Sequence, residues 1–156
     1  MHRRAFLLLV PGLGGCAGFT LRPSALDEAV GVRELSLAFA PDGTGSLQLA
    51  LDVDNPTVWD AVATGVDFSL ALRGRRYAVG TRGVRLELGA HSRHDLRVSF
   101  PLRCEPTGSS TPARTWWVRV EGSVALAFGE TVRRLPFRAE RWDRIAHFRP
   151  LRLEPQ

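Results

Sequence analysis

The chain has 156 residues, of which 44% are hydrophobic and 24% charged, so its length suits one globular domain with a sizeable core. Its formal net charge is +5, all 21 basic residues are arginine, and none is lysine. The missing lysine excludes a Walker A loop, a Schiff-base lysine and a Ser-x-x-Lys nucleophile, because each needs a lysine amine. We attribute the arginine bias to GC-rich coding and expect no nucleic-acid partner.

The first sixteen residues have the layout of a secretory signal. Arg3 and Arg4 precede the apolar residues 5–12, a run too short to span a bilayer, which takes roughly 20 residues. Leu13-Gly14-Gly15-Cys16 then resembles the lipobox of bacterial lipoproteins. The resemblance implies that residues 1–15 are removed and that Cys16 becomes an acylated N-terminus.

Acylation at Cys16 predicts a membrane partner and a place in the bacterial cell envelope. Ala17 after the cysteine favours, by analogy with well-studied lipoproteins, the outer membrane facing the periplasm. Without Arg3 and Arg4, 19 basic residues face 16 acidic ones, a net charge of +3. The alternative is an ordinary secretory signal in which Cys16 is a chance residue.

Once Cys16 is acylated, Cys104 is the one cysteine left, so no intramolecular disulfide is expected. We interpret Cys104 as a small, half-buried hydrophobic residue, with pairing between chains as the alternative.

Residues 16–29 are expected to form a tether, and from residue 30 onward an alternation of period two predicts β-strands. The first strand covers 30–39, with a possible bulge near Arg33-Glu34, and Pro41-Asp42-Gly43 predicts a turn. The second strand, 47–53, is expected to end at Asn55-Pro56, because proline cannot donate to the hydrogen-bond ladder.

Four more strands are expected at 66–72, 77–79, 84–88 and 96–100, with a tight turn at Gly74. The polar composition of residues 104–114 predicts a loop.

The longest alternation runs from Trp116 to Phe128, and Gly122 inside it indicates a bulge or a close backbone approach. Gly129-Glu130 predicts a two-residue hairpin, and Pro136 marks the last strand, 132–137, as an edge strand.

Seven or eight strands, each with one apolar face, predict an all-β protein built as an antiparallel β-sandwich of the immunoglobulin/fibronectin-like kind. A single closed barrel is the alternative. The sandwich is expected to occupy residues 30–140, and the basic, poorly periodic residues 141–156 form a C-terminal extension along its outside.

The order of motifs over residues 30–140 resembles the late-embryogenesis-abundant (LEA) type 2 family, also described as the water-stress and hypersensitive-response (WHy) domain. The motifs are a leucine-rich strand ending in Asn55-Pro56, then Gly65–Gly74, Ala78-Val79-Gly80, Leu88-Gly89-Ala90, Val118–Val124 and Leu135-Pro136-Phe137. One departure is Thr57, where the family often has a second asparagine.

The resemblance implies a β-sandwich linked to desiccation and other stresses, often a lipoprotein in bacteria, without catalytic residues. We interpret the family-motif positions as structural: Asn55, Pro56, Gly74, Gly80 and Gly122.

Catalytic and metal sites are not expected. His91 and His94 lack a third ligand at a supporting spacing, so we interpret them as loop residues. Asp52, Asp54 and Asn55 offer oxygens for Ca²⁺, but they also suit the polar face and end of a strand. No Gly-x-Ser-x-Gly elbow occurs, so we expect neither an enzyme nor a cofactor.

Two surface features are candidates for contact with a partner. Seven arginines against two acids between residues 73 and 97 make a local charge of +5, which suits anionic headgroups, although an ordinary solvated face is the alternative. The candidate contact residues are Arg73, Arg75, Arg76, Arg82 and Arg85. Trp116 and Trp117 are consecutive on one strand and must point to opposite faces, which leaves one of them for contact with a partner.

The leading hypothesis is a lipid-anchored, non-enzymatic protein that acts in envelope stress tolerance by contacting proteins or membrane surfaces. One alternative is a carrier that holds an apolar or lipid ligand between its sheets, in a cavity lined by Phe68, Leu70, Val98 or Phe100. Another is a scaffold subunit of an envelope complex.

Overall fold

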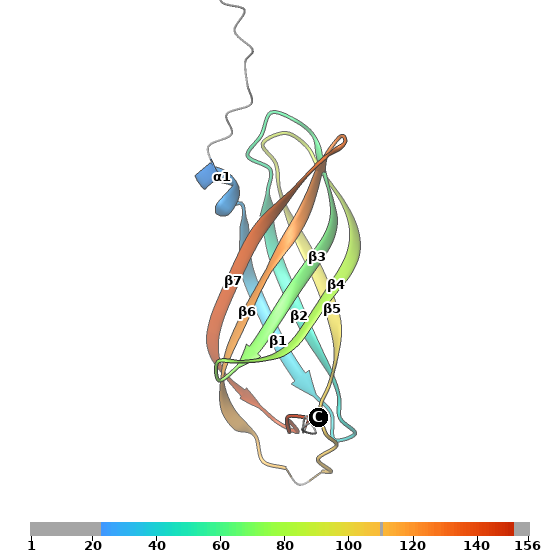
Figure 1. The fold of residues 1–156 in the computed structure, drawn as a ribbon, viewed down its shortest axis with the longest axis vertical. Coiled ribbons are helices and arrows are strands. Elements are labelled where there is room, and N and C mark those ends of the chain that lie inside the picture. The colour runs from blue at the N-terminus through green and yellow to red at the C-terminus, as the bar shows by residue number, and fades with distance from the viewer. Residues whose placement is uncertain (1–22, 110, 152–156) are drawn as a thin grey trace, which may run out of the picture.

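A computed structural model describes residues 23–109 and 111–151, and in these ranges the chain is almost entirely β-strand (Figure 1). The expected signal peptide and Cys16 lie outside the described residues. The elements are α1 (Pro23–Asp27), β1 (Val30–Phe39), β2 (Thr44–Asp54), β3 (Ala61–Leu72), β4 (Arg75–Leu88), β5 (Arg93–Arg103), β6 (Arg114–Phe128) and β7 (Thr131–Ile145).

The seven strands form two antiparallel sheets, with strand orders β1-β2-β5 and β4-β3-β6-β7 (Figure 1). The predicted all-β sandwich is therefore confirmed, and the closed-barrel alternative is wrong. β4 pairs with β3 and lies at an edge of the larger sheet, whereas the fourth strand of a constant-type immunoglobulin domain joins the other sheet.

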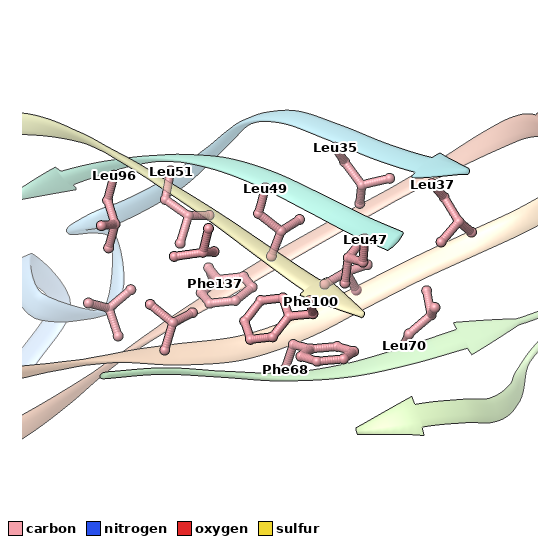
Figure 2. Close-up of a cluster of buried hydrophobic side chains, with 14 of the residues drawn as sticks. Leu35, Leu37, Leu47, Leu49, Leu51, Phe68, Leu70, Leu96, Phe100 and Phe137 are labelled. Carbon is pink, nitrogen blue, oxygen red and sulfur yellow. The ribbon is translucent and has the colours of Figure 1, made fainter. Parts of the chain in front are cut away.

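The core consists of the inward-facing side chains of both sheets (Figure 2). Leu47, Leu49 and Leu51 of β2 are buried and face the apolar side chains of β3 and β6. Phe68 and Phe100 approach each other from opposite sheets, with 4.3 Å between ring centroids. Both rings, like Leu70 and Val98, which the carrier hypothesis also named, are buried side chains of the core.

The first hairpin agrees with the sequence prediction. β1 has a register shift between Val32 and Glu34, where the bulge was expected. Gly43 has a φ of 87°, which provides the left-handed position that the turn before β2 requires. β2 ends at Asp54, directly before Asn55-Pro56.

The strands expected at 77–79 and 84–88 are one continuous strand, β4. The alternation changes parity between them, from Tyr77 and Val79 to Val84 and Leu86, and this suggested a break. In the structure, Val79 is 64% exposed, and the core-facing residues of β4 from Ala78 onward, including Val84 and Leu86, keep one parity. The pairing to β3 continues through a bulge next to the Gly65–Gly83 pair.

The last strand continues past the expected boundary at residue 140. Residues 141–145 pair with Arg114–Val118 of β6, and Ile145 and Phe148 are buried in the core. The alternation is hidden here because β7 is an edge strand that exposes charged residues on both faces. Residues up to Phe148 therefore belong to the sandwich, not to an extension along its outside.

At the other end, the expected tether includes structured residues. Residues 23–27 form one short helix, α1, and Ala29 is buried in the core. Among the described residues, no helix is long and apolar enough to cross a membrane.

Candidate functional site

Asn55 ties together two loops at one end of the sandwich. Its side chain is completely buried between the β2–β3 and β4–β5 loops. The amide nitrogen donates to the carbonyl oxygens of Trp59 at 2.7 Å, Gly89 at 3.0 Å and, more weakly, Leu88 at 3.4 Å. Its Oδ1 accepts from the Thr57 amide at 3.1 Å. The asparagine of the family motif is therefore a structural residue, as well as marking the end of β2.

Thr57 completes this network where the family often has asparagine. Its hydroxyl accepts from the Trp59 amide at 3.1 Å. The hydroxyl oxygen also lies 2.8 Å from Asn55 Oδ1 and 3.0 Å from the Trp59 carbonyl oxygen, and its single proton can satisfy one of them at a time. The threonine thus provides both a donor and an acceptor to this network.

The oxygens considered for Ca²⁺ have other partners. Asp52 lies 3.6 Å from Arg33, and Asp54 lies 3.4 Å from Arg93. Among the described residues, no group of three or more His, Cys, Asp or Glu side chains is placed to hold a metal ion.

The five candidate contact arginines do not form one surface. Arg82 donates to the Ser99 carbonyl of β5, and Arg85 lies 3.5 Å from Glu87 on its own strand. Arg73, Arg75 and Arg76 gather instead at the β3–β4 turn, at the end of the molecule where the described chain finishes (Figure 1).

An aromatic cluster closes this end of the sandwich. The Phe148 ring lies at its centre, with centroid distances of 4.8 Å to Phe39, 5.1 Å to Tyr77 and 4.9 Å to Trp116. The segment that carries Phe148 is fixed by hydrogen bonds to the β5–β6 loop. In one of these, the Glu105 amide donates to the Arg149 carbonyl at 3.0 Å.

Two polar groups lie near this cluster, the half-buried hydroxyl of Tyr77 and the buried thiol of Cys104. The Tyr77 hydroxyl donates to the Arg103 carbonyl, and burial, with a smaller contribution from Cys104, raises the pKa of Tyr77 to about 12. The Cys104 thiol is buried and lies 3.4 Å from the His147 carbonyl oxygen. This burial favours the interpretation of Cys104 as a core residue over a disulfide between chains.

Arg73 occupies a constrained position beside the cluster. It precedes Gly74 in a two-residue turn in which both residues have positive φ, 49° and 76°, as in a type I′ hairpin. Its amide donates to the Trp117 carbonyl at 2.9 Å, and its guanidinium lies 4.4 Å from the Trp116 ring centroid. The start of β6 thus holds both the backbone and the side chain of Arg73.

These residues surround a pocket of about 540 Å³, which we call the C-terminal pocket. It is lined by Leu72, Arg73, Arg75, Arg76, Tyr77, Trp116, Phe148, Pro150 and Leu151. The volume is within the range of small-molecule sites, about 300–1,000 Å³. Chemically, the lining combines guanidinium donors with aromatic and aliphatic surface.

Trp116 and Trp117 point to opposite faces, as predicted. Trp116 packs against the core, whereas Trp117 contacts Trp142 of β7 in a tilted arrangement with 5.2 Å between ring centroids. The Trp142 side chain is 66% exposed and shares a shallow surface hollow with Trp117 and Arg73.

The sequence indicates the three arginines as contact residues but not the pocket that they line. Phe148, Pro150 and Leu151 were assigned to an extension, and Tyr77 lies on a strand whose partner was unknown. No local pattern links these segments, because they meet only where four chain segments reach the same end of the sandwich.

Neither protein-family models nor curated proteins match this chain. Solved structures do. A candidate late embryogenesis abundant (LEA) protein has a TM-score of 0.56 at 13% identity, covering 76% of this chain and 71% of its own. The protein AT1g01470 from Arabidopsis thaliana has a TM-score of 0.55 at 12% identity, covering 79% of this chain and 85% of its own. The fold is of the LEA type.

A protein from Archaeoglobus fulgidus is also similar to this chain, with a TM-score of 0.54 at 17% identity, covering 75% of this chain and 95% of its own. At these identities the likeness concerns the fold. It agrees with the β-sandwich that the family resemblance implied for residues 30–140.

Proposed function

We propose that this protein is a non-enzymatic, lipid-anchored protein of the bacterial cell envelope that acts in desiccation or other stress tolerance. It works by contacting proteins or membrane surfaces. The observation that carries the stress role is the fold shared with a candidate LEA protein. The lipobox-like stretch ending at Cys16 supports anchoring, with the outer membrane facing the periplasm as the expected place.

The polar surface supports a binding role over catalysis. On the outer face of the larger sheet, Glu140 accepts from Arg119 at 2.6 Å and also pairs with Arg138. Asp67 binds Ser123 and Arg134, with the carboxylate 2.8 Å from the guanidinium. These carboxylates are occupied by ion pairs and hydrogen bonds within and between strands, an arrangement that suits a stable, charged contact surface.

Anchoring is tested by fractionating bacterial cells that express the full chain. The Cys16→Ser variant should move from the membrane fraction to the soluble fraction, because it lacks the thiol that is acylated. Cys104→Ser changes the other cysteine and is the matched control, which should stay with the membrane. A Cys16→Ser chain that remains in the membrane fraction would contradict the lipid anchor.

Protection is tested by drying a labile enzyme with an equimolar amount of the full chain carrying Cys16→Ser. Recovered activity should exceed that obtained with albumin. The control is the same chain with Leu126→Asp, which places a carboxylate at a completely buried core position and unfolds the sandwich. Recovery of enzyme activity no better than with albumin would contradict direct protection by this fold.

A further inference from the structure

The arginines of the C-terminal pocket differ from those elsewhere on the molecule. Within the described ranges, Arg73, Arg75 and Arg76 take part in no ion pair, and the lining of the pocket contains no acidic residue. By contrast, Arg119 and Arg138, on the outer face of the larger sheet, both pair with Glu140. Three guanidinium groups at a pocket without a carboxylate are complementary to an anion. Each planar guanidinium group can bind a phosphate or carboxylate through two parallel hydrogen bonds.

Arg73 is held in an orientation that favours ligand binding. A non-glycine residue at positive φ is disfavoured, so its position depends on the contacts around it. The Trp116 ring and the Thr115 carbonyl oxygen, 3.4 Å away, fix the guanidinium at the edge of the pocket. A side chain fixed in this way loses little conformational entropy when it binds a ligand.

The rest of the lining is apolar. Leu72, Phe148, Pro150 and Leu151 offer aliphatic and aromatic surface beside the guanidinium groups, and Leu151 is 52% exposed. Trp116 contributes its ring, and its indole N–H is buried without an acceptor within the described part of the chain. A simple inorganic anion would pair with the arginines and leave this apolar surface exposed to water.

We propose that the C-terminal pocket binds an amphiphilic anion, a phosphate or carboxylate group joined to an alkyl chain. The anionic head pairs with Arg73, Arg75 and Arg76, and the alkyl chain lies against Leu72, Phe148 and Leu151. This site lies at the end of the sandwich, not between its sheets, and the inference does not depend on a stress role.

Binding is tested with the full chain carrying Cys16→Ser, labelled with ¹⁵N and titrated with four probes. Octyl phosphate and octanoate carry head and tail, inorganic phosphate carries the head alone, and octanol carries the tail alone. Chemical shifts of the Trp116 indole N–H and of the Arg73–Tyr77 amides report on the pocket. We expect both amphiphilic anions to bind at least about tenfold more tightly than phosphate or octanol, because only they use both halves of the lining.

Two variants assign the site. Arg75→Ala/Arg76→Ala removes two consecutive, exposed arginines of the edge strand β4 and should weaken octyl phosphate binding about tenfold or more. Arg133→Ala/Arg134→Ala removes two consecutive arginines of the edge strand β7, outside the pocket, and should change binding less than about twofold. Equal effects of the two variants, equal binding of octanol or phosphate, or shifts elsewhere would each overturn the proposal. Because the readout is binding, its failure is distinct from failure in the drying experiment.

Discussion

Asn55 shows how one buried polar side chain can hold two loops. Removing it leaves the buried Thr57 amide without its acceptor and takes one donor from each of the carbonyls of Trp59 and Gly89. An unsatisfied buried polar group costs about 1–3 kcal/mol, so the effect exceeds the loss of any one hydrogen bond.

Asn55→Ala is therefore expected to lower the free energy of unfolding by about 3 kcal/mol, measured by urea denaturation. Gln48→Ala, at an exposed polar position of β2, the strand that precedes Asn55, is the control and should change stability by less than about 0.5 kcal/mol. A loss of stability no larger than the control's would show that water replaces the Asn55 network at little cost.

Tyr77 is the only tyrosine of the chain, so its titration can be followed by the ultraviolet absorbance of the phenolate. Burial raises its folded pKa to about 12 from an ordinary 10.0. Between these values the unfolded chain has lost the proton while the folded chain retains it. Stability should therefore be fully present below pH 10 and fall as the pH rises toward 12.

The Tyr77→Phe variant should lose this alkaline decrease while keeping its stability constant across the same interval. A titration midpoint near 10.0 in the folded protein would mean that the hydroxyl is solvated and that the end cluster is open.

At the scale of the elements, β3 and β6 approach each other closely at Gly122. A Cβ on Gly122 would lie 2.0 Å from the Asp67 backbone oxygen and 2.6 Å from Phe137 Cζ. The register continues through this position without a shift, so of the two interpretations of this glycine, the close approach is correct and the bulge is not. Gly80 plays a similar part on β4, where a Cβ would lie 2.6 Å from Phe68 Cε1.

Gly122→Ala should consequently destabilise the protein by about 2–4 kcal/mol, because the strand backbones must move apart. Gly31→Ala on β1 is the matched control: no atom lies within 4 Å of the added methyl, and we expect a change under about 1 kcal/mol. Chemical denaturation of both variants measures the difference. Equal stability of the two would show that β3 and β6 can separate locally at no cost.

At the scale of the whole molecule, the C-terminal segment completes the sandwich. Phe148 contacts rings from β1, β4 and β6, so it joins both sheets at one end. Phe148→Ala is expected to cost about 3–5 kcal/mol and to lower the thermal midpoint accordingly.

Leu151→Ala, three residues further on at a half-exposed position, should change stability by less than about 0.5 kcal/mol. If Phe148→Ala proved as mild as Leu151→Ala, residues beyond 145 would be an extension after all, as the sequence suggested.

The two ends of the molecule are far apart. A strand of 15 residues such as β6 is about 50 Å long at roughly 3.4 Å per residue. The expected anchor leads into α1 near the start of β1, whereas the C-terminal pocket lies at the opposite end of the strands (Figure 1). If the strands of the anchored protein stand perpendicular to the membrane, the C-terminal pocket therefore lies at the end of the molecule that is farthest from the membrane in which Cys16 is anchored.

The alternation of apolar residues by itself determined the fold class, the order of the strands along the chain and the position of most turns between them. This is possible because a half-buried strand imposes a period of two on its own residues. The sequence also indicated the strand end at Asn55-Pro56, the turn at Gly74 and the special backbone position at Gly122. Proline restricts the backbone and glycine frees it locally, so these positions can be recognised without knowing the tertiary structure. The apolar pattern failed at Val79, which is exposed although it alternates with Tyr77, and at the end of β7, where charged residues are exposed on both faces.

Tertiary structure alone decided the contacts between distant segments. Two of the partners of Asn55, Leu88 and Gly89, lie more than thirty residues away along the chain. The arginines between residues 73 and 76 line a pocket only because the fold brings Trp116 and Phe148 beside them. No local pattern contains these contacts, because which strand ends meet depends on how the two sheets pack.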